Sequence, residues 1–179
     1  MCTTPLVPDD NARLFLALWP APRVRAALLE YRDAWRWNTQ ASLVRPDKLH
    51  MTLHFIGNVP RHRLQQIRKG LDVPFEPFEL SFGHPGLWRH GLAVLQPHAT
   101  PSSLLQLHDA LRQALQRLEL PGESMEDFRP HITLARRAVG AVPPDREPVL
   151  RWRVRGYALV ESMHEPAGQY DLVQPMPEH

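Results

Sequence analysis

Two histidines in this chain begin the same four-residue pattern, His-x-Thr-Leu. The first copy contains His50 and Thr52, and the second contains His131 and Thr133. Two imidazoles with ordinary pKa values of about 6.5 can coexist at neutral pH as one base and one acid. Each Thr hydroxyl can donate a hydrogen bond to an anionic oxygen. The pair therefore predicts proton transfer at both ends of a displacement at an anionic centre such as a phosphoryl group.

The two copies belong to a longer internal repeat. An offset of 81 residues separates His50 from His131, and an offset of 78 separates Leu14 from Leu92 in two apolar segments. Two features at nearly one offset indicate an internal duplication. A single His on a strand is more often a structural residue than a catalyst, and the matched copies are what favour catalysis here.

Alternation of apolar and polar residues predicts that each motif lies on a strand. Along residues 48–59, strict alternation places His50, Thr52 and His54 on one face and Phe55 on the other. His54 is then expected to titrate near the site or to face solvent.

The other segments predict a fold of the α+β class, built from two similar halves. Helices are expected to follow Pro22, to cover residues 61–69, and to begin at Ser102. A final antiparallel pair is expected to turn at residues 165–168. The predicted strands other than the His50 strand cover residues 13–19, 78–82, 91–97, 127–136, 150–163 and 168–175.

Composition excludes several functional classes. The 21 Lys and Arg nearly balance the 19 Asp and Glu, so no broad surface for duplex nucleic acid is required. Cys2 is the only cysteine, which rules out a disulfide framework and favours an intracellular protein. The apolar run 14–19 is too short to cross a bilayer, and the start lacks a basic leader. We expect a cytoplasmic protein without membrane contact, with residues 1–179 forming one domain.

The remaining histidines and most tryptophans have ordinary structural interpretations. No pair of histidines has a metal-ligand spacing such as H-E-x-x-H, so no metal site is predicted. Core or loop packing is the expected role of Trp35, Trp37, Trp88 and Trp152. The histidines expected at the surface or in loops are His62, His84, His90, His98, His108, His164 and His179.

The motifs and their surroundings resemble the 2H phosphoesterase superfamily, in particular its RNA 2',3'-cyclic phosphodiesterase branch, also called 2'-5' RNA ligase or LigT-like. The resemblance rests on "RLFLALWP", "RPDKLHMTLHFIGNV", "FRPHITLAR" and "YALVESMHEPAGQYDLV". It implies a bilobal fold of two intertwined, pseudo-symmetric lobes. Each lobe would be an antiparallel sheet with helices on the outside, and a central cleft would separate the lobes.

The resemblance also implies an activity that needs no metal or other cofactor. The enzyme would open a 2',3'-cyclic phosphate at an RNA end and leave a 2'-phosphate, with His131 as base and His50 as acid. Thr52 and Thr133 would hold the non-bridging oxygens. Reversible 2'-5' RNA ligation, with an RNA 5'-hydroxyl replacing water, stays open as a further activity.

Arg136 and Phe55 are the remaining candidates for substrate binding. The family has an arginine shortly after its second motif, which matches Arg136, but unbroken alternation would place Arg136 opposite His131. A bulge or strand end would restore it to the catalytic face. Phe55 holds the equivalent position in the first half, where it would stack on a base if the same bend occurs and otherwise pack in the core, the slightly favoured alternative.

Three other functions fit the same residues. The enzyme could act on 2'-5' oligoadenylate or small cyclic nucleotides instead of RNA ends with 2',3'-cyclic phosphates. A non-catalytic module could bind RNA ends, although phosphate binding alone does not demand two imidazoles. A metal-dependent hydrolase would lose activity on chelation. In each case we expect a monomer.

Overall fold

The computed structural model describes residues 10–163 and 169–175, and its centre is one antiparallel sheet. Within these residues the sheet has nine strands, in the order β7-β4-β5-β6-β3-β1-β8-β9, with β2 paired to β6. The bounds are β1 Asn11–Leu18, β2 Ser42–Leu43, β3 Met51–Pro60, β4 Phe78–Trp88, β5 Leu92–Pro97, β6 Ile132–Arg136, β7 Leu150–Val154, β8 Ala158–Met163 and β9 Gln169–Pro175.

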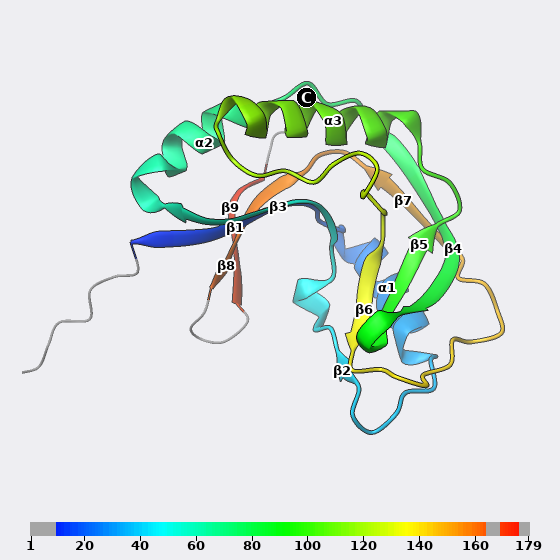
Figure 1. The fold of residues 1–179 in the computed structure, drawn as a ribbon. Helices are drawn as coiled ribbons and strands as arrows, with labels where there is room; N and C mark the ends of the chain where they lie inside the picture. Colours follow the sequence, from blue (N-terminus) through cyan, green and yellow to red (C-terminus); the bar gives the residue numbers. More distant parts are fainter. Residues whose placement is uncertain (1–9, 164–168, 176–179) are drawn as a thin grey trace, which may run out of the picture.

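The strand order is symmetric about the junction of β6 and β3, the strands that follow the two motif histidines. In the described register these strands meet at one residue pair, Met51 with Ile132. From there the two halves of the sheet diverge, and the sheet curves into an arch (Figure 1). The α+β class and the two antiparallel halves predicted from the sequence are therefore confirmed.

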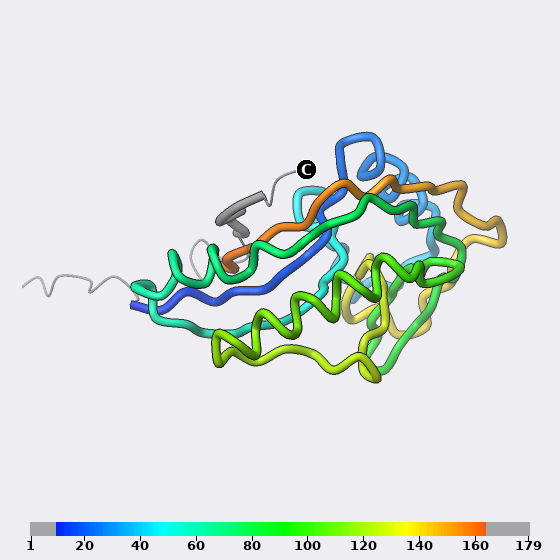
Figure 2. The backbone as a smooth tube through the Cα atoms, turned by 90° about the horizontal axis from the view of Figure 1, so that it is seen from above, coloured from blue at the N-terminus to red at the C-terminus, as the bar shows by residue number. Residues whose placement is uncertain are grey.

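One helix from each half of the chain covers the sheet of the other half. The helices are α1 (Pro22–Asp33), α2 (Leu64–Gly70) and α3 (Ser102–Arg117). Helix α1 contacts β7 in the second half, whereas α3 contacts β3 in the first half. Helices α2 and α3 run side by side over the outer face of the β1–β3 half (Figures 1 and 2). This exchange leaves the inner face of the arch clear of helices.

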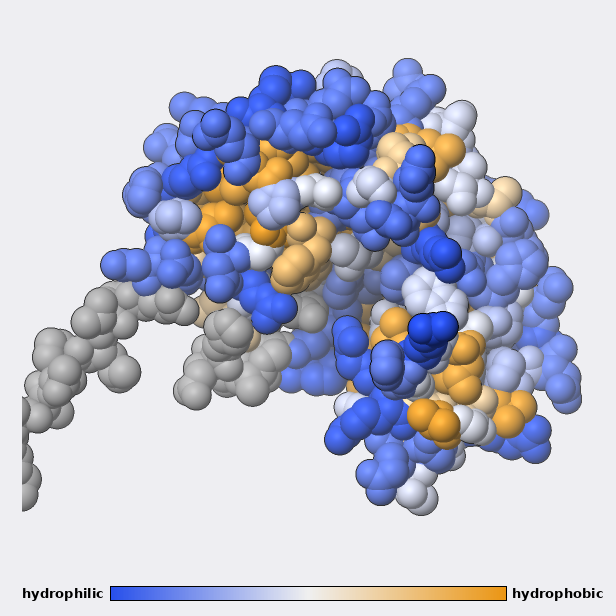
Figure 3. Space-filling model, viewed as in Figure 1, coloured by the Kyte–Doolittle hydropathy of each residue, from blue (hydrophilic) through white to orange (hydrophobic). Residues whose placement is uncertain are grey.

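Helix α3 forms because its apolar residues share one face. Leu104, Leu107, Leu111 and Leu115 recur at helical spacing and are all buried. Burying such side chains stabilises the fold by roughly 1.5–3 kcal/mol each. The outer faces of α2 and α3 are hydrophilic, and hydrophobic side chains gather beneath them (Figure 3).

Three predicted strands differ from the observed ones. The strand expected at residues 127–136 begins only at Ile132. The segment 150–163 forms two strands, because β7 pairs with β4 and β8 pairs with β1 in the other half. The chain crosses between the halves near Tyr157, whose buried hydroxyl donates to Leu71 O (2.7 Å) and accepts from Val73 N (3.0 Å). The strand expected at residues 78–82 continues to Trp88.

The C-terminal pairing was predicted correctly, since β8 and β9 are antiparallel neighbours. The turn expected at residues 165–168 lies outside the described residues. In the part of the chain that the structure describes, no helix combines the length and the apolar character needed to cross a membrane.

Candidate active site

A β-bulge interrupts the first motif strand directly after Thr52. Thr52 pairs with Ala17 of β1. His54 pairs with the preceding residue of β1, Leu16, so Leu53 is an extra residue without a partner. A bulge of this kind shifts the alternation of side chains by one position.

The second motif strand has the same bulge at the same motif position. Thr133 pairs with Val94 of β5, and Ala135 pairs with the preceding residue, Ala93. Leu134 is therefore the extra residue in β6, as Leu53 is in β3. The duplicated sequence thus folds into a duplicated irregularity.

The bulges bring the fifth residue after each histidine back to the inner face. Arg136 is exposed and lines the same cavity as His131 and Thr133. The bulge that was needed to place Arg136 on this face is therefore confirmed. Phe55 is 52% exposed and lines that cavity too. The preference for Phe55 in the core was wrong, because it assumed unbroken alternation.

His54 was expected beside the site or in solvent, and this was wrong. The bulge turns its ring away from the inner face, and the side chain is fully buried. Its Nδ1 accepts from Glu123 N (3.1 Å), and its Nε2 donates to His108 O (2.8 Å). The ring stacks on His108, which stacks in turn on Phe128, with 3.9 Å between centroids in each pair.

His108 was also placed wrongly at the surface, because it belongs to the buried face of α3. Burial and the neighbouring His54 lower the pKa of His108 to about 4, and burial lowers the pKa of His54. His62, His84, His90 and His98 are exposed as predicted. His164 and His179 lie outside the described residues.

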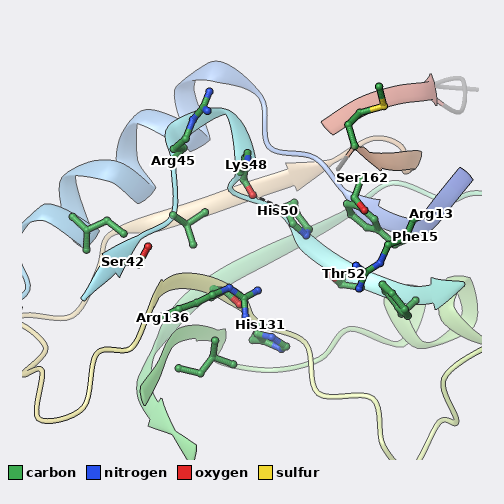
Figure 4. Close-up of a pocket in the computed structure, with 16 residues that line it drawn as sticks. Arg13, Phe15, Ser42, Arg45, Lys48, His50, Thr52, His131, Arg136 and Ser162 are labelled. Carbon is green, nitrogen blue, oxygen red and sulfur yellow. Dashed lines mark hydrogen bonds between the residues drawn. The ribbon is translucent and has the colours of Figure 1, made fainter. Parts of the chain in front are cut away.

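The inner face of the arch holds a cavity of about 660 Å³, here called the central cleft. It contains all six residues proposed from the sequence as catalytic or substrate-binding. Figure 4 shows His50 from the β3 side and His131 from the β6 side at this cleft, with Arg136 next to His131. The proposed residues that line it are His50, Thr52, Phe55, His131, Thr133 and Arg136.

The two motif histidines are held in the same way. His50 Nδ1 lies 2.6 Å from Lys48 O, and His131 Nδ1 lies 2.7 Å from Arg129 O. In each case the carbonyl belongs to the residue two positions earlier. A carbonyl accepts only, so Nδ1 carries the proton and Nε2 carries the lone pair in the neutral ring.

Aromatic side chains pack against both imidazoles. Trp19 is stacked on His50 with 5.2 Å between centroids and an interplanar angle of 1°, and Phe15 lies 5.1 Å from the same ring. Trp88 packs against His131 at 4.5 Å with a tilt of 56°. These contacts restrict the orientation of each ring and remove water from it.

Burial favours the neutral form of both rings. It lowers the pKa of His50 to about 4, partly opposed by the Lys48 carbonyl and assisted by the charges of His131 and Arg136. Burial also lowers the pKa of His131, opposed by the Arg129 carbonyl and assisted by Arg136. In the ligand-free protein at neutral pH, both histidines are therefore neutral.

Cations that sequence analysis did not select also line the central cleft. Arg13, Arg45 and Lys48 join Arg136 there, and Arg13 lies over the Phe55 ring at 5.1 Å. Arg45 pairs with Asp47 at 3.0 Å. Arg45 and Lys48 could have been found from their position directly before His50. Arg13 lies on β1 and carries no comparable signal.

Two further expectations concern packing and metals. The packing role predicted for tryptophans holds for Trp35 and Trp37, which stack at 4.9 Å, and for buried Trp152. Trp88 is half-buried and packs against His131 at the wall of a second cavity. Among residues 10–163 and 169–175, no three His, Cys, Asp or Glu side chains gather as metal ligands would. Metal independence itself stays a prediction.

Known proteins resemble this chain in sequence and structure. A family model described as the 2'-5' RNA ligase superfamily matches residues 20–164, a range that includes both histidine motifs. The chain is 33% identical to an RNA 2',3'-cyclic phosphodiesterase of Thermus thermophilus, over 87% of this chain and 84% of that protein. It is 31% identical to the RNA 2',3'-cyclic phosphodiesterase of Escherichia coli, over 86% and 85% of the two chains. The crystal structure of a phosphoesterase has a TM-score of 0.81 at 26% identity, with 93% and 97% covered.

Proposed function

Because the chain belongs to the 2'-5' RNA ligase superfamily, we propose that it hydrolyses the 2',3'-cyclic phosphate at RNA ends to a 2'-phosphate, using two histidines and no metal. The single observation that carries this proposal is the matched pair of imidazoles in the central cleft. Each has its Nδ1 bonded to the carbonyl two residues earlier, so each can exchange a proton at Nε2. The sheet contributes the two rings from opposite halves, as attack and departure on opposite sides of one phosphorus require.

In the proposed reaction, His131 acts as the base and His50 as the acid. Nε2 of His131 accepts a proton from the attacking water as the new O–P bond forms. Nε2 of His50 donates a proton to O3' as the P–O3' bond breaks, which leaves the phosphate on O2'. His50 must be protonated for this step, and the charge of the bound phosphodiester raises its pKa from the low value of the ligand-free protein.

The other residues of the cleft fit the binding of a charged ester. The hydroxyls of Thr52 and Thr133 can donate to the two non-bridging oxygens. Arg136 can neutralise the charge that these oxygens gain in the transition state. Phe55 offers an exposed ring for stacking on the terminal base, with Arg13 already over that ring. We further propose that the enzyme acts as a monomer on RNA ends.

Product analysis tests the proposal. The protein is incubated, with and without EDTA, with an oligoribonucleotide that ends in a 2',3'-cyclic phosphate. We expect equal conversion in both samples to an oligonucleotide with a terminal 2'-phosphate. A terminal 3'-phosphate contradicts the assigned leaving group, and loss of activity with EDTA supports the metal-dependent alternative instead.

A further inference from the structure

The chain between α3 and β6, here called the α3–β6 loop, carries the hydrogen-bond partner of the proposed base. In the described chain, no helix or strand lies between Arg117 and Ile132. The loop, yellow-green in Figure 1, runs back along α3 and ends at His131. The carbonyl of Arg129 lies 2.7 Å from His131 Nδ1 and keeps the proton on that nitrogen. The position of this carbonyl therefore decides whether Nε2 of His131 is free to accept a proton.

The matching carbonyl in the first half is held by local structure. Lys48 is the last residue of a 3-10 helix, η1 (Pro46–Lys48). Arg129, in contrast, lies outside the turns and helices of the described residues. Pro130 follows it, and a residue before proline has few backbone conformations available. The Arg129 carbonyl therefore depends on the placement of its other neighbour, Phe128.

The histidine stack, formed by His54, His108 and Phe128, fixes Phe128 to the core. The ring of His108 lies between the other two, with 3.9 Å between centroids in each pair. His54 comes from β3 and His108 from α3, and both are fully buried. Phe128 is 9% exposed, although its neighbours on both sides are exposed. The position 81 residues after His54 holds Ala135, so the stack has no copy in the second motif.

Both histidines of the stack also contact the loop nearer to α3. His54 Nδ1 accepts a hydrogen bond from Glu123 N (3.1 Å), and His108 Nδ1 lies 3.1 Å from Met125 Sδ. The His54 ring is itself held, because its Nε2 donates to His108 O (2.8 Å). The loop is therefore attached to the two histidines at three places, and the last of them, Phe128, directly precedes Arg129.

We propose that His54 and His108 are positioning residues, which hold the α3–β6 loop so that the Arg129 carbonyl keeps the proton of the neutral His131 ring on Nδ1. This inference rests on the proposed function, because it explains how the proposed base is kept in its active tautomer. If the loop moves away, the proton can occupy Nε2, and that nitrogen then cannot accept a proton from water. Among the described residues that line the two cavities, neither His54 nor His108 is found. Their loss should therefore lower kcat and leave KM little changed.

Heteronuclear NMR of the ring nitrogens tests this role, because a protonated nitrogen and one with a lone pair differ in chemical shift. In the wild type at neutral pH, we expect His131 to carry its proton on Nδ1. His108→Leu removes the flat ring but keeps an apolar side chain. We expect it to give both tautomers of His131 and to lower kcat about tenfold to a hundredfold. His108→Phe restores an aromatic ring in the stack and should restore both the tautomer and kcat.

A substitution on the loop tests the same role with both histidines in place. A Cβ on Gly122 would lie 3.2 Å from Leu115 Cδ1 and 3.6 Å from His54 Nδ1. Gly122→Val should therefore lift the loop and act as His108→Leu does. Glu126→Val is the matched control, because Glu126 is exposed on the same loop, and it should behave as the wild type. Leu111→Ala controls for lost stability and should leave the His131 tautomer unchanged.

The proposed function and this inference fail in different ways. If the wild type does not hydrolyse the cyclic phosphate, the proposed function is wrong, and the spectra still decide whether the stack sets the His131 tautomer. The inference is overturned if His131 keeps its proton on Nδ1 in both His108→Leu and Gly122→Val, whatever their kcat. It is also overturned if Leu111→Ala changes the tautomer as much as they do. Should His108→Leu not fold, Gly122→Val and Glu126→Val decide the question.

Discussion

The two imidazoles of the central cleft are held alike but surrounded differently. Both bind a carbonyl two residues earlier through Nδ1. His50 contacts Phe15 and a parallel Trp19, whereas His131 contacts one tilted indole and lines a second cavity together with Trp88. The duplicated sequence therefore supplies two equivalent groups, and their unequal surroundings are what would separate the proposed acid from the proposed base.

Removal of either imidazole should lower turnover with little effect on binding. We expect His50→Ala and His131→Ala each to lower kcat by roughly 10²- to 10⁴-fold, the usual cost of losing a general acid or base. The dissociation constant of the 2'-phosphate product should change much less. His62→Ala is a suitable control, because His62 is exposed outside the cleft. Retention of near wild-type kcat by either alanine variant would contradict the two-histidine mechanism.

The pH dependence of kcat/KM should be bell-shaped and shifted to acid. This quantity reports the free enzyme, in which the pKa values of both His50 and His131 are lowered by burial. Activity needs one ring protonated and one neutral, so the maximum should lie below the ordinary imidazole pKa of about 6.5. The maximum of kcat should lie at higher pH, because bound phosphate favours protonation. Initial rates from about pH 4 to about pH 9 would show whether kcat/KM instead peaks above 6.5.

Two adjacent arginines give a matched test of the bulge in β6. Arg136 lines the cleft, whereas Arg137 lies at the strand end with a positive φ of 54° and has no place in the cleft wall. Arg136→Gln should lower kcat/KM about 10²- to 10³-fold by removing charge from the transition-state oxygens. Arg137→Gln removes the same charge and should have little effect. Equal losses in the two variants would indicate a general effect of net charge.

At the scale of elements, the bulges and the histidine stack decide what each strand presents to the cleft. The bulge in β3 turns Phe55 inward and sends His54 under α3. There, hydrogen bonds to His108 O and from Glu123 N satisfy both ring nitrogens in the neutral form. Burial disfavours the charged form of both His54 and His108, and a proton on Nδ1 of His54 would also lose the second bond.

The buried histidines of the stack formed by His54, His108 and Phe128 should make the folded protein less stable in acid. The folded-state pKa of His108 is about 4, below the unfolded value of about 6.5, so the unfolded state binds more protons between them. The contribution of His108 to the free energy of unfolding is therefore fully present above about pH 6.5. It falls as pH decreases toward about 4, and the loss is on the order of 3 kcal/mol. His54, His50 and His131, with lowered pKa values, add to the loss in the same direction.

Urea unfolding at a series of pH values measures this loss. His108→Phe keeps an aromatic ring between His54 and Phe128 and removes the titrating group. Its free energy of unfolding should fall less steeply between about pH 6.5 and about pH 4 than that of the wild type. A variant with the same steepness as the wild type would show that His108 does not cause the sensitivity.

At the scale of the whole molecule, the exchange of helices links the two halves. Helix α1 covers the sheet of the second half, and α3 covers the sheet of the first half. The strands β7 and β8 are consecutive in the chain but lie in opposite halves. Each half of the sheet is therefore covered at least in part by a helix of the other half, and we infer that the chain folds as one cooperative unit.

Unfolding should accordingly occur in one transition. Circular dichroism follows the helices, and fluorescence follows tryptophans in both halves, so the two thermal unfolding curves should coincide. Leu111→Ala removes a fully buried side chain of α3 and should lower both midpoints together, at a cost of about 2–5 kcal/mol. Two separated transitions, or a shift in one signal alone, would indicate independently stable halves.

The sequence by itself determined the two catalytic candidates, their Thr partners and the fold class. These follow from residue types and from spacing within a duplicated chain, because alternation and internal repeats are local properties. The position of Arg136 was conditional on a bulge, since strict alternation contradicted it. The resemblance of the second motif to that of the family suggested that Arg136 lies at the site. The pairing of β6 with β5 shows the bulge that places it there.

Only the tertiary structure decided the side of Phe55, the burial of His54 and His108, and the joining of two cavities at His131. A bulge depends on which residue of the neighbouring strand is paired, and a cavity wall depends on segments that are distant along the chain. Both are set by packing between elements, for which no local pattern in the sequence exists.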